Sequence, residues 1–407
     1  MVKRHSYPDT WSIGTLEDIC VPNGVVRGPF GGALKKEIFV PFGYKVYEQR
    51  NAIYQSVNIG SYYVNESKYR EMSRFAVKSG DYIISCSGTI GRIYQIPLTF
   101  PKGIINQALL KLTINTEKIN PTYFYKYFQW DKFQQKIIDD TQGGAMKNLV
   151  GMDIFKKAPI VLPEMKEQTA IAEALSDIDG LISSLQKLIE KKKAIKQGAM
   201  QELLTGKKRL PGFSGKWTNT TLGRCFSKIV GGGTPSRAIS EFWNGEIPWA
   251  TVKDFATFNP YKTQEYISEA GLNHSSTHLI PKGTLITSTR MGIGKIVIYY
   301  VDVAINQDLK ALFVSDDVSK EYIYHLFGMV GKIIESLGNG STVKGIRIEQ
   351  LKNLSIVLPK KNEQQAIAQV LSDMDSEIEQ LEKKLAKYQQ IKQGMMQELL
   401  TGRIRVV

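Results

Sequence analysis

The strongest constraint on the fold is a long internal repeat. Residues 162–210 align with residues 358–406 without a gap, at an offset of 196, and more than half of the aligned positions are identical. A repeat of this length indicates a duplicated structural unit. The sequence therefore predicts two halves in tandem, each with a globular segment followed by a charged segment that is poor in glycine.

Each copy of the repeat has the pattern of a long helix. Apolar residues recur at alternating spacings of four and three residues, which is the heptad seam of a coiled coil. Pro163 and Pro359 precede the predicted helices, and Gly206 and Gly402 follow them, where a helix C-terminus favours glycine. About 40 residues at roughly 1.5 Å per residue give rods of about 60 Å. The predicted seam residues are Ile171, Leu175, Ile178, Ile182, Leu185, Ile189, Ile367, Leu371, Met374, Ile378, Leu381 and Leu385.

The two seams predict that the long helices pair with each other. An antiparallel pair is the easier arrangement, because a globular segment connects the first helix to the second. The alternative is that each helix packs on its own globular segment, but the narrow spacing of the seam favours helix–helix pairing. The expected divisions are a globular domain at 1–163, a long helix at 164–206, a linker at 207–215, a second globular domain at 216–359, and a second long helix with a tail at 360–407.

The excess of positive charge lies on the globular segments. The chain carries a net charge of +14, from 53 basic and 39 acidic residues. Residues 1–163 have a net charge of +8 and residues 207–359 of +6, whereas the segments 164–206 and 360–402 each have a net charge of −1. Basic surfaces attract polyanions, so the pattern favours two separate surfaces for a nucleic acid. The lysine run at 191–193 is then a solvated helix face rather than a DNA-binding stripe.

The two globular segments share a pattern of short strands, turns and helices. Both contain a basic turn rich in glycine, at 79–96 and 282–299. Short apolar runs bounded by Gly, Ser and Pro predict strands, and the segments 121–139 and 319–337 predict helices. Each globular unit is therefore expected to be α+β, and the two units to be distant relatives with an internal pseudo-twofold relation.

The composition excludes several classes of protein. No stretch approaches the roughly 18 apolar residues of a membrane span, and no apolar run follows the basic N-terminus, as a secretory signal would require. Cys20, Cys86 and Cys225 are scattered and odd in number. They predict neither a zinc site nor a disulfide framework, and they fit a reducing cytoplasm.

Short motifs mark the globular segments and their junctions with the helices. The first half carries Gly-Pro-Phe-Gly at 28–31. The second carries Gly-Gly-Gly-Thr-Pro-Ser at 231–236 and Phe-Trp-Asn-Gly-Glu-Ile-Pro-Trp at 242–249. Both halves share Leu-Pro and Glu-Gln at the start of the helix, and Gln-Glu-Leu-Leu-Thr-Gly at its end. Over essentially the full length, the chain resembles the DNA-specificity subunit of type I restriction–modification systems. The first half lacks Gly-Gly-Thr-Pro, so its DNA-contacting loop cannot be copied from the second.

The resemblance implies a function for each part. Two target recognition domains would each read one half of an asymmetric bipartite site in the major groove of double-stranded DNA. The helical pair would set the unread spacer and bind two modification (methyltransferase) subunits, and restriction subunits would add an ATP-dependent nuclease. The chain itself would be no enzyme. It would bind no cofactor or metal, and S-adenosylmethionine, ATP and Mg would be bound by the partner subunits. Such a complex is cytoplasmic, in a prokaryote, and directs adenine methylation or DNA cleavage.

Candidate DNA-binding residues lie in the glycine-rich loops, where the backbone can approach DNA closely. Arg, Lys, Asn, Ser and Thr are the side chains that read base edges or bind phosphates. Any one of them could instead be a solvated loop residue. The candidates are Arg27, Lys35, Lys36, Ser87, Thr89, Arg92, Lys147 and Asn148 in the first half, and Thr234, Ser236, Arg237, Thr289, Arg290, Lys295, Ser341, Thr342 and Lys344 in the second.

Some conspicuous polar and aromatic residues have a structural interpretation. An Asn-Gln pair follows each basic turn, at 106–107 and 306–307. Because side-chain amides often bond to nearby backbone, we predict that these residues pin a loop. Trp243 and Trp249 are predicted to pack in a core or a turn rather than to stack on bases.

No set of residues predicts catalysis by this chain. Asn259-Pro260-Tyr261 lacks the second proline of an amino-methyltransferase loop, and Asp308-Leu309-Lys310 lacks a second metal-binding acid for a nuclease. The run 292–295 lacks the first glycine and the final Ser or Thr of a phosphate-binding loop, and His274 and His278 lack the glutamate of a zinc-protease helix. The remaining alternative is a coiled-coil adaptor without a DNA target, which would not need basic globular units.

Overall fold

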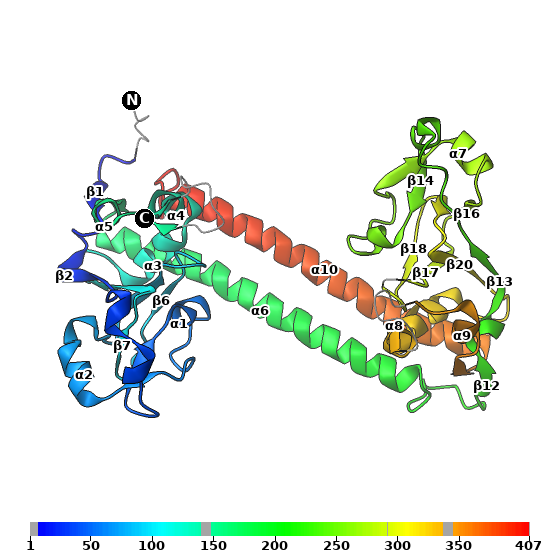
Figure 1. The fold of residues 1–407 in the computed structure, drawn as a ribbon, viewed down its shortest axis with the longest axis horizontal. Coiled ribbons are helices and arrows are strands. Elements are labelled where there is room, and N and C mark those ends of the chain that lie inside the picture. The colour runs from blue at the N-terminus through cyan, green and yellow to red at the C-terminus, as the bar shows by residue number, and fades with distance from the viewer. Residues whose placement is uncertain (1–6, 140–147, 291, 337–344, 407) are drawn as a thin grey trace. The chain divides into compact units, whose positions relative to one another are not determined.

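The computed structural model describes residues 7–139, 148–290, 292–336 and 345–406 of the chain. It contains two compact units. Unit 1 consists of Met1–Ser184 and Leu385–Val407, and unit 2 of Leu185–Lys384 (Figure 1). Each unit therefore combines one globular segment with one part of each long helix.

Unit 1 contains two small central sheets. The antiparallel four-stranded sheet has the order β2-β8-β5-β6, and the three-stranded sheet has the order β4-β3-β7, in which β3 and β7 are parallel. Apolar runs such as Tyr82-Ile83-Ile84 form strands because both of their faces are buried. The strands are β2 (Cys20–Arg27), β3 (Tyr44–Tyr47), β4 (Tyr63–Val64), β5 (Tyr82–Ser85), β6 (Ile93–Gln95), β7 (Gly103–Ile105) and β8 (Leu109–Ile114).

Aromatic residues build the core beside the helices of unit 1. α3 (Pro121–Gln129) begins with a proline, and the Asn120 side chain accepts hydrogen bonds from the first turn. The predicted helix over 121–139 is interrupted at Trp130, whose backbone is extended and whose buried indole contacts Tyr127. The other elements are α1 (Gln49–Ile53), α2 (Glu66–Glu71), α4 (Asp131–Ile137), α5 (Met152–Lys156), and the antiparallel pairs β1 (Ser12–Thr15) with β11 (Pro159–Leu162) and β9 (Ile138–Asp139) with β10 (Asn148–Leu149).

Unit 2 repeats this architecture. Its sheets have the orders β13-β20-β17-β18 and β15-β14-β19-β16, and β14 and β19 are the parallel pair. The strands are β13 (Phe226–Gly231), β14 (Ile247–Ala250), β15 (Glu265–Ile267), β16 (His278–Ile280), β17 (Leu285–Ser288), β18 (Ile296–Ile298), β19 (Val303–Ile305), β20 (Leu309–Val314), and the antiparallel pair β12 (Thr218–Thr221) and β21 (Ser355–Leu358). The helices are α7 (Glu269–Asn273), α8 (Lys320–Ser336) and α9 (Ile348–Lys352).

Strand registers make the relation between the units specific. In unit 1, Tyr82 of β5 lies opposite Leu112 of β8, and in unit 2, Leu285 of β17 lies opposite Leu312 of β20. The sheet order and these registers confirm that the globular segments are two versions of one fold. The main difference is β16, which extends the second sheet of unit 2.

The two long helices run antiparallel within each unit. They are α6 (Met165–Leu203) and α10 (Lys361–Leu399). In unit 2, Lys192 pairs with Glu377 at 2.6 Å and Lys196 with Asp375, so residue numbers that rise along α6 fall along α10. In unit 1, Lys392 of α10 reaches α6 at 2.6 Å. The mixed α and β fold with two long helices is therefore as predicted.

The seam residues do not all serve the helix pair. All twelve are buried or half-buried. However, Ile171 and Leu175 share a core with the sheet and helices of unit 1 as well as with the end of α10, and Ile367 and Leu371 have the equivalent place in unit 2. The ends of the long helices are thus built into the globular cores, so helix pairing and packing on the globular segments both occur.

Equivalent polar contacts close the two units. Glu167, in the first turn of α6, is almost wholly buried and accepts hydrogen bonds from the indole N–H of Trp11 at 2.8 Å and from Arg405 in the C-terminal tail. Glu363, in the first turn of α10, accepts two from Arg209 at 2.5 and 2.8 Å. The tail that follows each long helix therefore binds the start of the other. Both tails begin at a glycine with positive φ, 69° at residue 206 and 71° at residue 402, as the predicted helix ends require.

In the part of the chain that the structure describes, no helix is long and apolar enough to span a bilayer.

Candidate nucleic-acid interface

In each unit, a turn that a side-chain hydrogen bond fixes connects the two sheets; we call it the pinned turn. It lies between β7 and β8 in unit 1 and between β19 and β20 in unit 2. The side-chain oxygen of Asn106 accepts a hydrogen bond from the N–H of Ala108 at 3.0 Å, and that of Asn306 from the N–H of Asp308 at 3.2 Å. The predicted role of both asparagines in pinning a loop is confirmed. Because the same bond forms twice, the following residues occupy equivalent positions.

Glycines in the two sequence motifs allow another loop to approach this turn. A Cβ atom on Gly28 would lie 1.9 Å from the carbonyl oxygen of Asn106, and one on Gly232 would lie 1.8 Å from the carbonyl oxygen of Ile305. No side chain fits at such distances. The motif glycines are therefore required by packing, and they place the residues that follow them beside the pinned turn.

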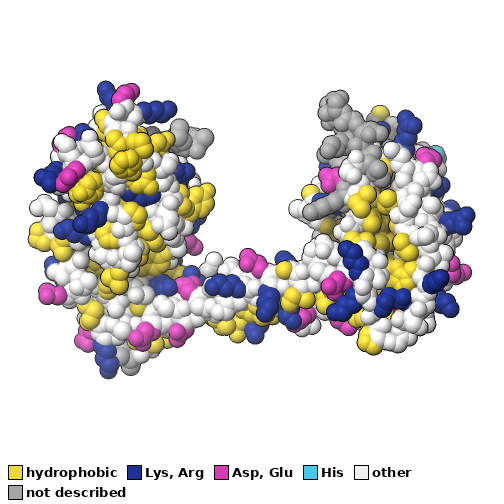
Figure 2. All heavy atoms as spheres, turned by 90° about the horizontal axis from the view of Figure 1, so that it is seen from below, with side chains coloured by type: hydrophobic (Ala, Val, Ile, Leu, Met, Phe, Trp, Pro, Cys, Tyr) yellow, Lys and Arg dark blue, Asp and Glu magenta, His cyan; other side chains and the backbone are white. Residues whose placement is uncertain are grey.

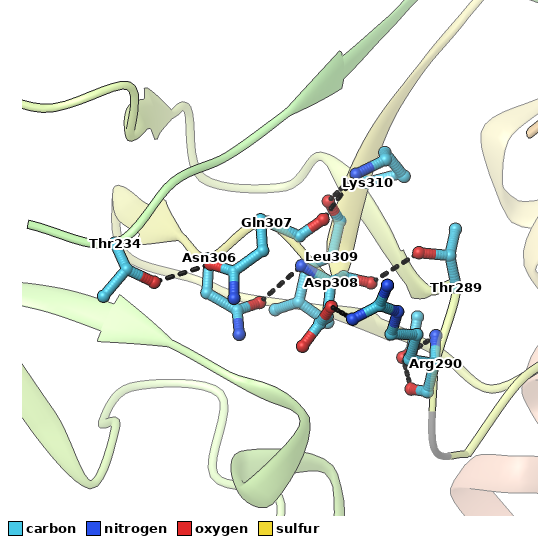
Figure 3. Close-up of polar contacts among 9 residues, drawn as sticks. Thr234, Thr289, Arg290, Asn306, Gln307, Asp308, Leu309 and Lys310 are labelled. Atoms are coloured by element: carbon cyan, nitrogen blue, oxygen red, sulfur yellow. Dashed lines mark hydrogen bonds and ion pairs between the residues drawn. The ribbon is translucent and has the colours of Figure 1, made fainter. Parts of the chain in front are cut away.

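The motif of unit 2 is held by side chains around it. The Thr234 hydroxyl donates to the side-chain oxygen of Gln307 at 2.6 Å, which confirms a pinning role for Gln307 (Figure 3). The indole N–H of Trp249 donates to the carbonyl oxygen of Gly233 at 3.1 Å, and that of Trp243 to Ser236 at 3.0 Å. The two tryptophans pack at the turn as predicted. Gln107, the counterpart of Gln307, is exposed as Gln307 is, and a pinning role for it stays a prediction.

An exposed arginine lies next to the pinned turn of unit 2. Arg290 follows β17, and its guanidinium lies 3.6 Å from the carboxylate of Asp308 (Figure 3). Arg290, Asp308 and Arg347 line an open cleft of about 690 Å³. Arg347 was not among the sequence candidates, because nothing in its neighbourhood marks it. Asp308 has a signal in the sequence, because it directly follows the Asn-Gln pair at 306–307.

The structure places the predicted DNA-binding residues as follows. In unit 1, Arg27 is half-buried at the end of β2, and the exposed residues are Lys35, Lys36, Ser87, Thr89 and Arg92. In unit 2, Thr289 is largely buried and donates its hydroxyl hydrogen to the carbonyl oxygen of Asp308 at 2.9 Å. The exposed residues there are Thr234, Ser236, Arg237, Arg290 and Lys295. Asn148 lies in β10, and the candidates outside the described residues are Lys147, Ser341, Thr342 and Lys344.

These residues do not gather at one place. Thr289 and Arg290 line the cleft with Arg347, whereas Lys295 lines a different cavity of about 520 Å³ beside α8. Arg237 is already engaged, because Glu265 accepts hydrogen bonds from its guanidinium at 2.5 and 2.9 Å and its Cζ atom lies 3.6 Å from the centroid of the Trp243 ring. Figure 2 shows Lys and Arg side chains spread over the visible face of each unit. Basic side chains thus occur widely on both units, and only some of them line a cleft.

A partly buried charge cluster joins each globular segment to the long helices. In unit 1, Asp179 of α6 accepts hydrogen bonds from Lys126 of α3 at 2.5 Å and from Lys392 of α10 at 2.6 Å. Burial alone would raise the pKa of Asp179, but the hydrogen bonds and charges of the two lysines outweigh it and hold the pKa below its usual value.

Unit 2 has a histidine in the equivalent cluster. Asp375 of α10 pairs with Lys196, and Nδ1 of the buried His325 lies 3.9 Å from its carboxylate. Burial, together with the charge of Lys196, lowers the pKa of His325 against the opposing effect of Asp375. Ser372 contacts the other ring nitrogen at 3.0 Å. The partners of His325 lie about 50 residues away in the chain, so the sequence alone gives no signal for this cluster.

Among the residues with a described placement, no group of three or more His, Cys, Asp or Glu is arranged to hold a metal ion. The three cysteines are buried and unpaired, and burial raises the pKa of the Cys86 thiol to about 12. Such a thiol stays protonated near neutral pH and is a poor nucleophile.

Comparison with known proteins gives consistent results. A family model for the type I restriction modification DNA specificity domain matches residues 8–197 and again 215–393. The type I restriction enzyme MjaIX specificity subunit of Methanocaldococcus jannaschii is 34% identical over 38% of this chain and 37% of that protein. A putative MjaX specificity subunit of the same organism is 25% identical over 98% of this chain and 95% of that protein.

A solved structure shares the fold over the full length. The S subunit of a type I restriction–modification system from M. genitalium superposes with a TM-score of 0.56 and 16% sequence identity, covering 98% of each chain. At this identity the similarity concerns the fold alone.

Proposed function

The chain belongs to the family of type I restriction–modification DNA specificity domains, and from this premise we propose that its two units each read one half of a bipartite site in double-stranded DNA. The observation that carries the proposal is the duplicated fold. The antiparallel four-stranded sheet has the equivalent strand order in both units, with the same pinned turn, but exposed residues next to the turn differ, such as Ser87 and Arg290. Two copies of one scaffold with different surface residues suit two different sequences.

The charge distribution supports DNA as the partner. The globular segments carry +8 and +6, and the helical segments are nearly neutral. Lys and Arg on both units would bind phosphates and fix the register, and residues at clefts such as that of Arg290 would contact base edges. A coiled-coil adaptor without a DNA target has no use for two basic units, so we rank that function second.

The long helices suit a role as a spacer. α6 and α10 have 39 residues each, or about 58 Å of helix. Successive major grooves on one face of DNA recur about every 34–36 Å. We infer that the helices set the number of unread base pairs and bind two modification subunits. Those subunits would supply S-adenosylmethionine chemistry, and restriction subunits would use ATP and Mg.

Catalysis is assigned to the partner subunits and not to this chain. The relatives are named specificity subunits of restriction enzymes, which supports a recognition role. Purified chain incubated with labelled S-adenosylmethionine and DNA should transfer no methyl groups, and transfer would contradict this assignment.

Salt-dependent binding tests the DNA proposal. The logarithm of the affinity of the full chain for a pool of DNA duplexes should fall linearly with the logarithm of the salt concentration, because each phosphate contact releases counterions. A protein with six to ten such contacts loses roughly 10³–10⁵ in affinity between 50 and 200 mM salt. A flat response would exclude the proposed DNA surfaces.

A further inference from the structure

Arg290 and Asp308 form an ion pair that is exposed on one side only. The Arg290 side chain is 63% exposed and the Asp308 side chain 20%. Because an exposed ion pair contributes little to folding stability, stability does not account for the pair.

Backbone contacts hold both residues in place (Figure 3). The carbonyl oxygen of Asp308 accepts hydrogen bonds from the N–H and the hydroxyl of Thr289, at 2.8 and 2.9 Å. The N–H of Asp308 donates to the side-chain oxygen of Asn306. The N–H of Arg290 donates to the Ser288 hydroxyl oxygen at 3.2 Å. The backbone of Asp308 is therefore fixed, and its carboxylate is placed to orient the guanidinium of Arg290.

Unit 1 shows that the fold does not need this pair. The N–H of Cys86 donates to the carbonyl oxygen of Ala108 at 2.9 Å, as the N–H of Thr289 does to Asp308. Ser87 and Ala108 thus occupy the positions of Arg290 and Asp308. The same backbone hydrogen bond forms in both units, and in unit 1 both charged partners are missing together. A pair that is present in one half and wholly replaced in the other is expected where the halves differ in what they bind.

We propose that Arg290 reads a guanine in the half-site bound by unit 2, and that Asp308 is a positioning residue that aims the guanidinium. This inference rests on the proposed function. The chemistry is specific, because guanine presents two acceptors, O6 and N7, in the major groove, and the planar guanidinium donates to both at once. One terminal nitrogen of the guanidinium lies 3.6 Å from the Asp308 carboxylate, and the Arg290 side chain, 63% exposed at the cleft, remains open to the ligand. Unit 1 cannot form the same contact with Ser87.

The test uses the full chain and a pool of DNA duplexes of random sequence, followed by sequencing of the bound fraction. The variants are Arg290→Ser and Asp308→Ala, which introduce the residues of unit 1, the double variant of these two, and the conservative changes Arg290→Lys and Asp308→Asn. The matched control is Arg224→Ser, which removes an exposed arginine of unit 2 that does not line the cleft.

Wild type should enrich two separate words, one with a required G·C pair. Arg290→Ser should reduce the preference at that pair by roughly 10- to 100-fold and leave the other word unchanged. Arg290→Lys should lose most of the same preference while it keeps the charge. Asp308→Ala should have a smaller effect at the same pair, Asp308→Asn a still smaller one, and the double variant should be no worse than Arg290→Ser. The control should retain both words.

Three results would overturn the inference. The first is an equal loss of affinity of Arg290→Ser for all sequences, which is the behaviour of a phosphate contact. The second is an effect of Arg290→Ser in both words, and the third is that Arg290→Ser leaves the base preferences unchanged. Failure of the proposed function would give a different result, because the wild-type chain would then enrich no sequence at all. Thermal unfolding of Arg290→Ser, Asp308→Ala and the double variant should match wild type, because unit 1 folds with these residues at the equivalent positions.

Discussion

The charge cluster at Asp179 gives the most quantitative prediction. Asp179→Asn keeps the size of the side chain but removes the charge that Lys126 and Lys392 share. Hydrogen bonds to charged groups contribute about 1.5–3 kcal/mol each. The side chains of Asp179 and Lys392 are 29% and 28% exposed, which places both bonds at the low end, whereas Lys126 is 10% exposed and would be left without its counter-ion. Because asparagine still accepts one bond, we expect a loss of about 2 kcal/mol.

Urea unfolding followed by circular dichroism measures this loss, with Asp177→Asn as the control. Asp177 lies on an exposed face of the same helix. A loss of this size lowers the unfolding temperature of a unit of 150–250 residues by roughly 4–8 °C. If Asp179→Asn and Asp177→Asn differed by less than about 0.5 kcal/mol, the cluster would not join the helices as described.

The pH dependence of the same variant provides a second check. The pKa of Asp179 is lowered in the folded protein, so its contribution is complete above the ordinary aspartate value of about 3.9. It is lost as the pH falls through the lowered folded value. The difference between wild type and Asp179→Asn should therefore be constant near neutral pH and shrink in acid. A difference that grew on acidification would contradict the assignment.

Two further predictions concern packing and titration. Gly232→Ala should destabilise unit 2 by about 2–3 kcal/mol, because its Cβ would lie 1.8 Å from the carbonyl oxygen of Ile305. The control Gly198→Ala, in open space on α6, should instead raise the free energy of unfolding by about 0.5–1 kcal/mol. Equal urea midpoints for the two variants would contradict this prediction. Since burial lowers the pKa of His325, the unfolded chain binds a proton that the folded chain resists, so the free energy of unfolding should fall as the pH drops below about 6.5. His325→Gln should flatten this fall, and an unchanged slope in urea titrations at pH 5.5 to 8 would refute it.

The repeat made the architecture predictable, whereas local interruptions were not. The seam periodicity and the terminal glycines predicted α6 and α10, because a 39-residue helix leaves a long regular signal. The break at Trp130 was missed, because the segment around it keeps the apolar pattern of a helix. Trp130 has an extended backbone and is buried in the core of unit 1 with residues distant in the sequence, such as Ile160 and Leu175, and a single segment does not encode such packing.

The site was predictable at the level of loops more than of residues. Loop composition pointed to Arg290 and the pinned turns. It could not separate Arg290, which faces a cleft, from Arg237, which Glu265 occupies, because Glu265 is 28 residues away in sequence. Arg347 reaches the same cleft through a bridge between residues 290 and 345. Such pairings depend on topology, which single loops do not encode.

Methylation of host DNA tests the central claim most directly. Adenine methylation would be mapped by sequencing in host cells with and without the gene for this chain. We expect one class of methylated sites to disappear with the gene. Its members should contain two different short words, separated by a fixed number of unread bases, because two related but distinct units are joined by helices of fixed length. Loss of no sites, or loss of an uninterrupted palindromic site, would contradict the two-unit reading of DNA.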